Sequence, residues 1–193
     1  HDAKVVYESA ELIKSYGFQL GIQLMIGLPG DSPEACIFSA EETVKIKPDI
    51  ARLYPTVVIE GTKLYDLCRD GSYIPLSEEE AVFRTKEMYK ILDKAGINII
   101  RVGLKSSDLI TPEGLIVGLK SSDLINFDNP LLSNYHPAFR QLVEGEIARE
   151  IIEEKLISLH AGDIEVFSNP ASFSNMVGNA GRNKKYFSEK YPE

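Results

Sequence analysis

Two glycine-bearing loops are the parts of this chain whose residue types and spacing could hold a ligand. The first, Gly27-Leu28-Pro29-Gly30, follows an apolar run and precedes Ser32-Pro33, which is typical of a capped helix start. Its glycines would let a ligand approach the backbone, and a helix start offers N–H groups to an anion. The Lys and the glycine spacing of a phosphate loop are absent. The residues alone therefore leave two interpretations, a ligand-facing turn or a tight connection between strand and helix.

The second loop, Gly178-Asn179-Ala180-Gly181, lies near the end of the chain, in a region rich in positive charge. The basic residues that follow it are Arg182, Lys184 and Lys185. In KH domains a Gly-x-x-Gly loop clamps a nucleotide backbone while nearby Lys or Arg supplies positive charge. The pattern therefore predicts RNA binding through residues 177–187, with a pair of Lys-rich surface helices separated by glycines as the alternative.

The elements expected around this loop support the comparison with KH domains. We expect a short strand at 164–167, a helix near 170–177 and a basic helix after the glycines. Since a KH fold needs further strands, these elements predict only an incomplete, small α+β (KH-like) tail over residues 161–193.

Composition limits the other kinds of chemistry. The 193 residues carry a net charge of −8, which argues against nucleic-acid binding by the whole surface but leaves room for a local basic patch. Cys36 and Cys68 are the only cysteines, too few and too far apart for a zinc site or a disulfide framework. The glutamates of residues 144–154 lack a Glu-x-x-His partner, which is typical of a solvated helix face. No metal site is predicted.

Residues 136 and 137 are the last candidate for chemistry. His136 precedes Pro137, and the pair predicts the start of a helix that runs to about residue 160. Neither His1 nor His160 is local to it, and no Ser or Cys is coupled to His136 in the sequence. A nucleophilic triad is therefore not indicated.

Alternating strands and helices must position these residues. The apolar run 18–26 is typical of a strand buried on both faces, and further strands are expected at 50–59 and 97–102. This order is typical of an α/β architecture with a parallel sheet, and we predict a partial parallel β/α (TIM-like) barrel within residues 1–160. The helices expected between the strands are 3–16, 33–46, 63–69 and 78–94.

An identical repeat interrupts this pattern, because residues 102–110 recur at 117–125. Two copies are too few for a solenoid, which needs about three repeats to bury a core. The repeat indicates a recent local duplication or a sequence error. We expect at least one copy to form an irregular loop.

Four blocks of sequence, in order, resemble the radical S-adenosylmethionine (radical SAM) catalytic subunit of Elongator and its bacterial relatives. The blocks are Gly21–Glu34, Arg52–Leu76, Ile99–Leu104 and His136–Glu144. The resemblance covers about residues 1–160 and implies that they form the C-terminal half of a radical SAM barrel. It implies a parent protein that is a radical SAM iron–sulfur oxidoreductase and acts in RNA modification.

In that family a Cys-x-x-x-Cys-x-x-Cys loop holds a 4Fe–4S cluster, which cleaves S-adenosylmethionine to a deoxyadenosyl radical. Cys36 and Cys68 cannot supply three thiolates at that spacing. We therefore expect the chain to be a fragment without the cluster, inactive alone, whose partner is the missing N-terminal half of the barrel. The resemblance places near the cofactor Gln23, Met25, Gly27, Leu28, Pro29, Gly30, Arg52 and Tyr54.

The same resemblance places His136 and Arg140 at the edge of the catalytic cleft, where the guanidinium could meet a phosphate or carboxylate of the substrate or RNA. One alternative is an oxygen-independent coproporphyrinogen III oxidase-like radical SAM protein, which shares the apolar strand and the Gly-Leu-Pro-Gly turn. Another is a non-catalytic module that binds RNA or a partner, with exposed sheet edges that favour homo-oligomers. No apolar run is long enough for a membrane span, and the few cysteines favour a reducing cytoplasm.

Overall fold

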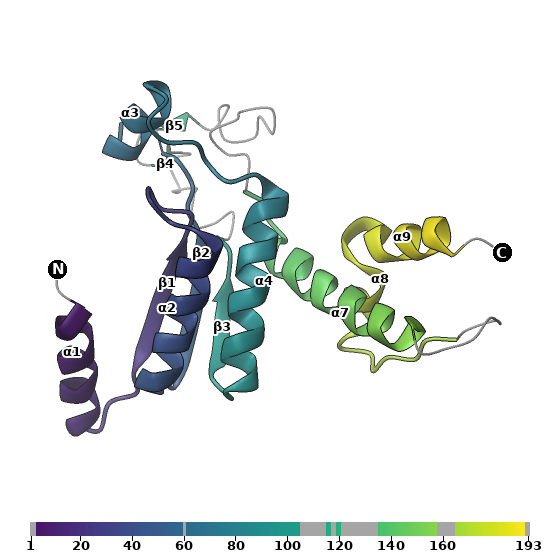
Figure 1. Cartoon of the computed structure of the whole chain (residues 1–193), viewed down its shortest axis with the longest axis horizontal. Coiled ribbons are helices and arrows are strands. Elements are labelled where there is room, and N and C mark those ends of the chain that lie inside the picture. Colours follow the sequence, from purple (N-terminus) through teal and green to yellow (C-terminus); the bar gives the residue numbers. More distant parts are fainter. Residues whose placement is uncertain are drawn as a thin grey trace. The chain divides into compact units, whose positions relative to one another are not determined.

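A three-stranded parallel sheet organises the first part of the chain (Figure 1). The computed structural model describes residues 3–59, 61–104, 115–116, 119–120, 135–157 and 165–191. Within them β1 (Gly21–Ile26), β2 (Ile50–Pro55) and β3 (Asn98–Val102) are neighbours in that order. The predicted α/β class is confirmed, whereas three parallel strands do not by themselves establish a barrel.

A one-residue slip interrupts the pairing of β2 with β3, while β1 and β2 pair in unbroken register. Ala51 pairs with Ile99, but Arg52 pairs with Arg101, so Ile100 is the extra residue of a β-bulge. Paired residues on neighbouring strands share a face of the sheet. The bulge therefore sets Arg101 on the same face as Arg52.

The strands are shorter than the apolar runs that predict them. Phe18 precedes β1 and is 69% exposed, whereas Val58 follows β2 and is 1% exposed, yet neither lies in a strand. Apolar character therefore continues past the strand ends because loop residues such as Val58 are buried, not because the ladder extends.

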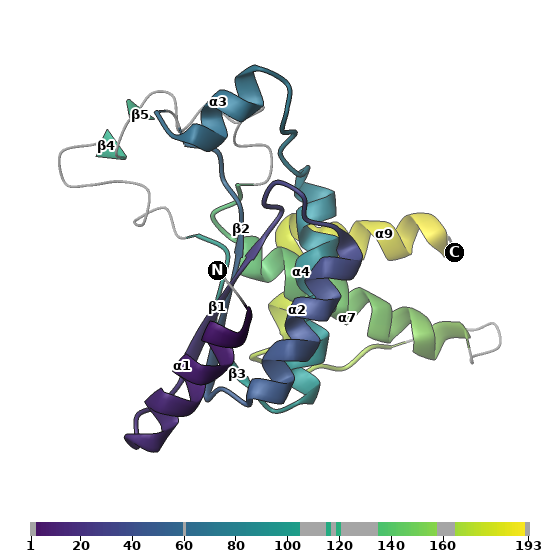
Figure 2. The same cartoon turned by 60° about the vertical axis from the view of Figure 1, so that its left-hand side comes forward.

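Two long helices, α2 (Pro33–Ile46) and α4 (Glu78–Lys94), cover one face of the sheet and pack against each other (Figure 2). Both begin as the sequence predicts. The Ser32 hydroxyl accepts a hydrogen bond from the backbone N–H of Ala35, and Ser77 accepts one from Glu80. The fully buried side chains between these helices and the sheet include Ile26, Ala51, Leu53, Met88 and Leu92.

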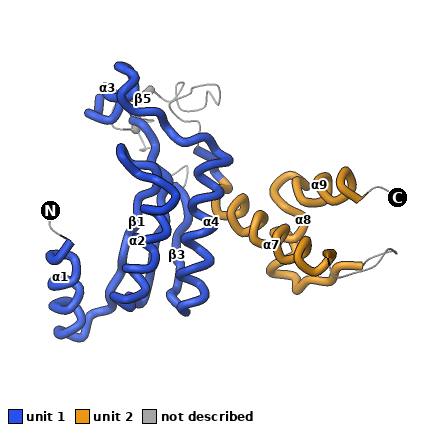
Figure 3. The backbone as a smooth tube through the Cα atoms, in the orientation of Figure 1, with its two compact units in different colours: residues 1–137 blue, residues 138–193 orange. Residues whose placement is uncertain are grey.

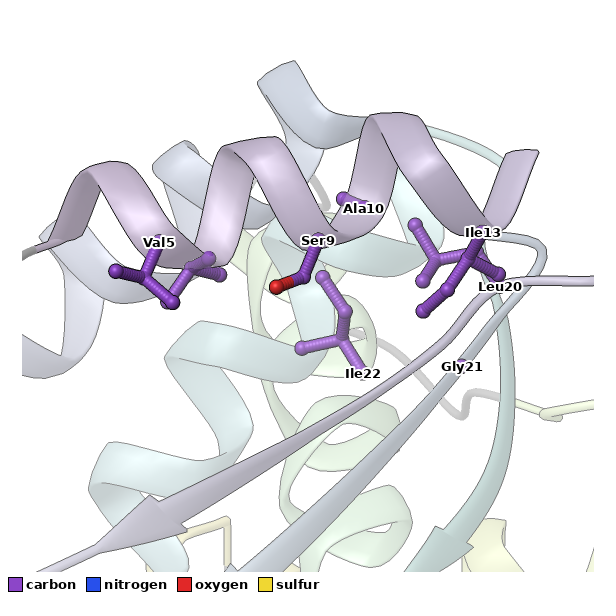
Figure 4. Close-up of a pocket in the computed structure, with 8 residues that line it drawn as sticks. Val5, Ser9, Ala10, Ile13, Leu20, Gly21 and Ile22 are labelled. Atoms are coloured by element: carbon purple, nitrogen blue, oxygen red, sulfur yellow. The ribbon is translucent and has the colours of Figure 1, made fainter. Parts of the chain in front are cut away.

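The first helix, α1 (Ala3–Ser15), packs loosely. Of its described residues only Ala10 is buried, and its larger apolar side chains Val5, Val6, Leu12 and Ile13 are exposed. Tyr7 donates to Glu42 of α2, and Lys14 donates to the carbonyl of Ile46. Between α1 and β1 lies an open, mostly apolar groove of about 390 Å³ (Figure 4).

Two smaller segments complete the first unit. Helix α3 (Lys63–Arg69) matches its predicted bounds, and the Thr62 hydroxyl accepts from the N–H of Tyr65 at its start. Strands β4 (Leu115–Ile116) and β5 (Leu119–Lys120) pair antiparallel. Most of the repeated nonapeptide, and hence its expected irregular loop, lies outside the described residues. No helix within the described ranges is long and apolar enough to cross a membrane.

The chain divides into two compact units after Pro137 (Figure 3). The second unit contains α7 (Phe139–Ile157), α8 (Phe173–Val177), the 3₁₀ turn η2 (Asn179–Gly181) and α9 (Arg182–Lys190). The boundary predicted near residue 160 falls outside the described residues. The strand predicted at 164–167 is wrong for residues 165–167, which form no ladder, so the described tail 165–191 is helical rather than α+β.

Side-chain contacts fasten α9 to α7. Glu153 of α7 accepts a hydrogen bond from the Tyr186 hydroxyl at 2.6 Å and also binds the Lys190 ammonium. The Arg149 guanidinium lies over the Tyr186 ring, 4.7 Å from its centroid. These contacts orient one face of the basic helix toward α7.

Two glycines in this unit should respond in opposite ways to replacement by alanine. Gly145 lies inside α7, where an added Cβ would make only ordinary contacts at 3.7 Å or more. We expect Gly145→Ala to raise the free energy of unfolding by about 0.5–1 kcal/mol, because alanine favours the helix. Gly178 has φ +80°, and a Cβ added to it would lie 2.8 Å from the backbone nitrogen of Asn183. Gly178→Ala should lower stability by about 1–3 kcal/mol.

Urea unfolding of the two variants beside the unchanged chain provides the measurement. A loss of stability in Gly145→Ala, or none in Gly178→Ala, would contradict the packing described here.

Candidate functional site

The turn after β1 is held from both sides at Gly27. This residue has φ +84°, and an added Cβ would lie 2.6 Å from the Leu76 side chain. Its N–H donates to Asp31 Oδ2 at 2.7 Å, and its carbonyl accepts from the buried Tyr73 hydroxyl at 2.6 Å. The backbone groups of Gly27 are therefore used within the protein, while Leu28, Pro29 and Gly30 form the exposed part of the turn.

Asp31 joins the turn to the start of α2. Besides the bond from Gly27, its carboxylate accepts the N–H of Ser32 at 2.9 Å and the Cys36 thiol at 3.2 Å. Burial, with a smaller contribution from Asp31, raises the pKa of Cys36 to about 12. The thiol is neutral at pH 7 and acts as a hydrogen-bond donor, which makes it a structural group and a poor metal ligand or nucleophile.

Arg84 of α4 supplies a positive charge beside this arrangement. Its side chain is 11% exposed, and its Nε donates to Glu80 at 2.7 Å. Its charge opposes part of the increase in the pKa of Cys36. The turn, α2 and α4 thus form one packed support beneath the residues of the sheet face.

The register of β1 and β2 brings four predicted cofactor residues together. Gln23 pairs with Arg52 and Met25 pairs with Tyr54, so the four form two successive rows on the same face. Gln23 and Arg52 are exposed and Met25 is 41% exposed, whereas Tyr54 is buried. The rows lie just before the glycine turn, at the carboxyl end of the strands.

Sequence reasoning missed Arg101 of β3, which extends the first row. Arg101 pairs with Arg52 only because of the bulge at Ile100. Strict alternation from Ile99 would put Arg101 on the helix-covered face together with Ile99. No local sequence signal marks such a bulge, so this neighbour could not have been found without the pairing.

The candidate residues of the second unit have different surroundings. Gly178 is buried against Asn183, whose side-chain amide donates to the carbonyl of Gly145 at 2.8 Å. Asn179 donates to Gln141 of α7 at 2.8 Å. These contacts tie the Gly-x-x-Gly loop to α7, and its binding to RNA stays a prediction.

The basic side chains that follow the loop are at the surface. Arg182, Lys184 and Lys185 of α9 are exposed, and Lys185 forms an ion pair with Glu189 at 3.8 Å. In α7, Arg140 donates from Nε to Glu144 at 2.7 Å. His136 belongs to the first unit and Arg140 to the second.

Metal chemistry is not supported by the described part of the chain. Among those residues, no group of three or more His, Cys, Asp or Glu side chains could hold a metal ion. The two cysteines are both free, Cys36 buried and Cys68 half-buried.

Comparison with known proteins identifies related sequences and a related structure. Residues 48–149 match the family described as the Radical_SAM C-terminal domain. A tRNA uridine(34) acetyltransferase of Methanocaldococcus jannaschii is 35% identical over 85 residues, which are 42% of this chain and 16% of that protein. Elongator complex protein 3 of Homo sapiens is 38% identical over 85 residues, which again are 42% of this chain and 16% of that protein. These matches span about one sixth of the length of either relative.

The related structure is that of Methanocaldococcus infernus Elp3 with an N-terminal deletion (1–46). The two structures superpose with a TM-score of 0.54, and the aligned residues are 25% identical. The alignment covers 80% of this chain and 31% of the Elp3 chain. The predicted resemblance to radical SAM proteins of the Elongator type is confirmed by these matches.

The hydrogen bond from Tyr73 to Gly27 should stabilise the turn measurably. We expect Tyr73→Phe to lower the free energy of unfolding by about 1–2 kcal/mol, because a buried carbonyl loses its partner. Tyr16→Phe is the matched control, since Tyr16 is 73% exposed. Equal unfolding midpoints for the two variants in urea would show that the bond contributes nothing.

Cys36 should resist alkylation at a pH where an ordinary thiol reacts. With its pKa raised from 9.0 to about 12, Cys36 is mostly protonated at pH 9, and its thiolate fraction grows only toward pH 12. We expect iodoacetamide to label Cys68 first at pH 9, as followed by mass spectrometry of the folded chain. Labelling of Cys36 at the same rate would contradict the burial of the thiol and its bond to Asp31.

Proposed function

This chain belongs to the Radical_SAM C-terminal domain family, and we propose that it acts in an Elongator-like radical SAM enzyme that modifies tRNA. The relatives named for tRNA uridine(34) and for Elongator support this proposal over the porphyrin-related alternative. The observation in the chain that carries it is the register of β1 and β2. That register groups Gln23, Met25, Arg52 and Tyr54 on one face of the sheet beside the turn.

We propose that the sheet continues into a parallel β/α barrel. Within the described sheet, β1 and β3 are the outer strands, and β2 lies between them. Further parallel strands at these edges would enclose the face that carries Gln23 and Arg52. The similarity to a larger Elp3 structure supports this arrangement, in which an N-terminal half-barrel is the partner of the chain.

The residues of the chain do not fit a 4Fe–4S cluster. Such a cluster needs three closely spaced thiolates, but Cys36 is protonated and bound to Asp31, and Cys68 lies 32 positions further along the chain (68 − 36). We therefore propose that cysteines outside residues 1–193 hold any cluster of the parent enzyme, and that this chain alone is inactive.

The residues do fit one wall of an S-adenosylmethionine site. Gln23 and Arg52 offer polar groups to its amino-acid portion, while Met25 offers an apolar, polarisable surface two residues further along the strand. When bound, S-adenosylmethionine supplies the radical chemistry. The role of this chain is to bind the cofactor and, through the packed turn after β1, to hold it in one orientation.

The proposal predicts a binding defect when the apolar part of this wall is removed. In the protein at its native length, Met25→Ala should weaken S-adenosylmethionine binding about tenfold, the expected effect of a lost apolar contact. Ile74→Ala is the control, because Ile74 is 82% exposed in the same unit. Equilibrium dialysis with labelled S-adenosylmethionine measures both.

Anaerobic reconstitution with iron and sulfide completes this test. The native-length protein should hold a cluster and, when given S-adenosylmethionine, tRNA and a one-electron reductant such as dithionite, should release 5′-deoxyadenosine. Residues 1–193 alone should hold no stoichiometric iron. Native protein without iron, or without release of 5′-deoxyadenosine, would overturn the proposed function.

A further inference from the structure

We propose that α9 and the Gly-x-x-Gly loop before it form a surface that binds single-stranded RNA. The loop receives the phosphate backbone, Lys184 and Lys185 supply positive charge, and the rings of Phe187 and Tyr191 stack with a base. The surface belongs to the second unit (Figure 3), whereas the S-adenosylmethionine wall belongs to the first. The proposal rests on the proposed function only for the choice of RNA over DNA.

The distribution of charge is the first observation behind the proposal. Residues 166–188 contain no Asp or Glu, although the chain as a whole has a net charge of −8. Lys184 is exposed, and none of the described acidic side chains pairs with it. Lys185 meets Glu189 at 3.8 Å, with side chains 77% and 68% exposed. Such an exposed pair contributes little stability and leaves the ammonium group accessible.

Contacts with α7 decide which side of α9 faces outward. Asn183 and Tyr186 both donate hydrogen bonds to α7. An α-helix has about 3.6 residues per turn, so Lys184 and Lys185 lie on the side away from these two residues. The two ammonium groups are therefore available to a ligand of the folded protein.

The loop is fixed on its inner side and open on its outer side. Gly178 is buried against Asn183, and the Asn179 side chain donates to α7 at 2.8 Å. Ala180 is exposed, and a Cβ added to Gly181 would meet nothing within 4 Å. A phosphodiester backbone can approach this outer side without a cost for ordering the loop.

The aromatic residues favour a nucleic acid over other polyanions. Phe187 and Tyr191 lie about one and two turns after Lys184, so the three residues form one line along the helix. The two rings are stacked, with centroids 6.4 Å apart, and Tyr191 is 48% exposed. Bases of single-stranded RNA stack on exposed aromatic rings, whereas a polyanion without bases gains nothing from them.

The first test measures the contribution of the two lysines in the native-length protein. Fluorescence anisotropy at low salt should show saturable binding of a labelled oligouridine of about ten nucleotides. The double variant Lys184→Gln/Lys185→Gln should weaken this binding about tenfold. It should also reduce the slope of log affinity against log salt by about 0.7 for each lost phosphate contact. Lys155→Gln is the matched control, since Lys155 is exposed on α7 in the same unit.

The second test uses two nearly isosteric variants in the loop. Ala180 has φ +50°, a conformation that Asn and Asp adopt more readily than Ala, so both replacements should keep the fold. Ala180→Asp sets a negative charge where the phosphate backbone would lie. It should therefore bind oligouridine about tenfold more weakly than Ala180→Asn. Equal affinity of the two variants would show that the backbone does not lie at the loop.

The third test separates stacking from charge. Tyr191→Leu should weaken binding of oligouridine about fivefold, but not binding of inorganic polyphosphate, which has no bases. Tyr16→Leu is the control, because Tyr16 is 73% exposed in the first unit. An equal loss for both probes, or for both variants, would contradict a stacking role for Tyr191.

Three results would overturn the RNA surface as a whole. One is the absence of saturable binding of oligouridine to the unchanged protein. Another is an equal loss of affinity in Lys155→Gln and in the double lysine variant, with thermal unfolding showing that both are folded. The third is tighter binding of the DNA oligomer of corresponding sequence, which would contradict the choice of RNA.

Failure of this surface and failure of the proposed function give different results. Met25→Ala alters the cofactor wall, so it should lose S-adenosylmethionine binding in dialysis and still bind oligouridine. The absence of a cluster or of 5′-deoxyadenosine release would overturn the proposed function, while anisotropy needs neither the cluster nor the cofactor. Loss of RNA binding in Met25→Ala would show that the RNA lies at the sheet instead and would overturn the surface on α9.

Discussion

The parallel pairing of β1, β2 and β3 is the constraint on which the rest of the first unit depends. Side chains of a strand alternate between faces, so the register decides which residues α2 and α4 bury and which remain accessible. Ile26 and Leu53 are fully buried beneath these helices. Arg52, which precedes Leu53 in β2, faces the other side of the sheet and is exposed. Moving β2 by one residue would bury Arg52 and expose Leu53, and an unpaired buried charge is strongly unfavourable.

Local signals predicted the helices and the order of elements well. Ser32 and Ser77 mark the starts of α2 and α4, and α3 matches its predicted bounds because Thr62 caps it. The strand bounds were less accurate, since buried loop residues such as Val58 are as apolar as a strand. The bulge at Ile100 had no signal at all, because it depends on pairing between segments almost fifty residues apart.

The two glycine loops also show the difference between what a local pattern predicts and what contacts with distant residues decide. Their spacing suggested close approach of a ligand to the backbone, but the structure also shows close approach of other residues. Gly178 accommodates the buried Asn183, which bridges α7 and α8 through the carbonyls of Gly145 and Asn175. A glycine pattern shows that something approaches the chain closely, and only three-dimensional contacts show whether that is a ligand or another part of the protein.

Gly27 has a consequence for how this turn can vary among related sequences. Its positive φ disfavours other residues, and the space that a Cβ would need is filled by Leu76. A substitution at Gly27 would therefore require a smaller residue at Leu76 and would still be strained. Packing and backbone conformation are therefore sufficient reasons for glycine at this position, and its presence in a relative would be no evidence of contact with a ligand. Gly30 has open space where a Cβ would lie, so only its φ of +82° favours glycine there.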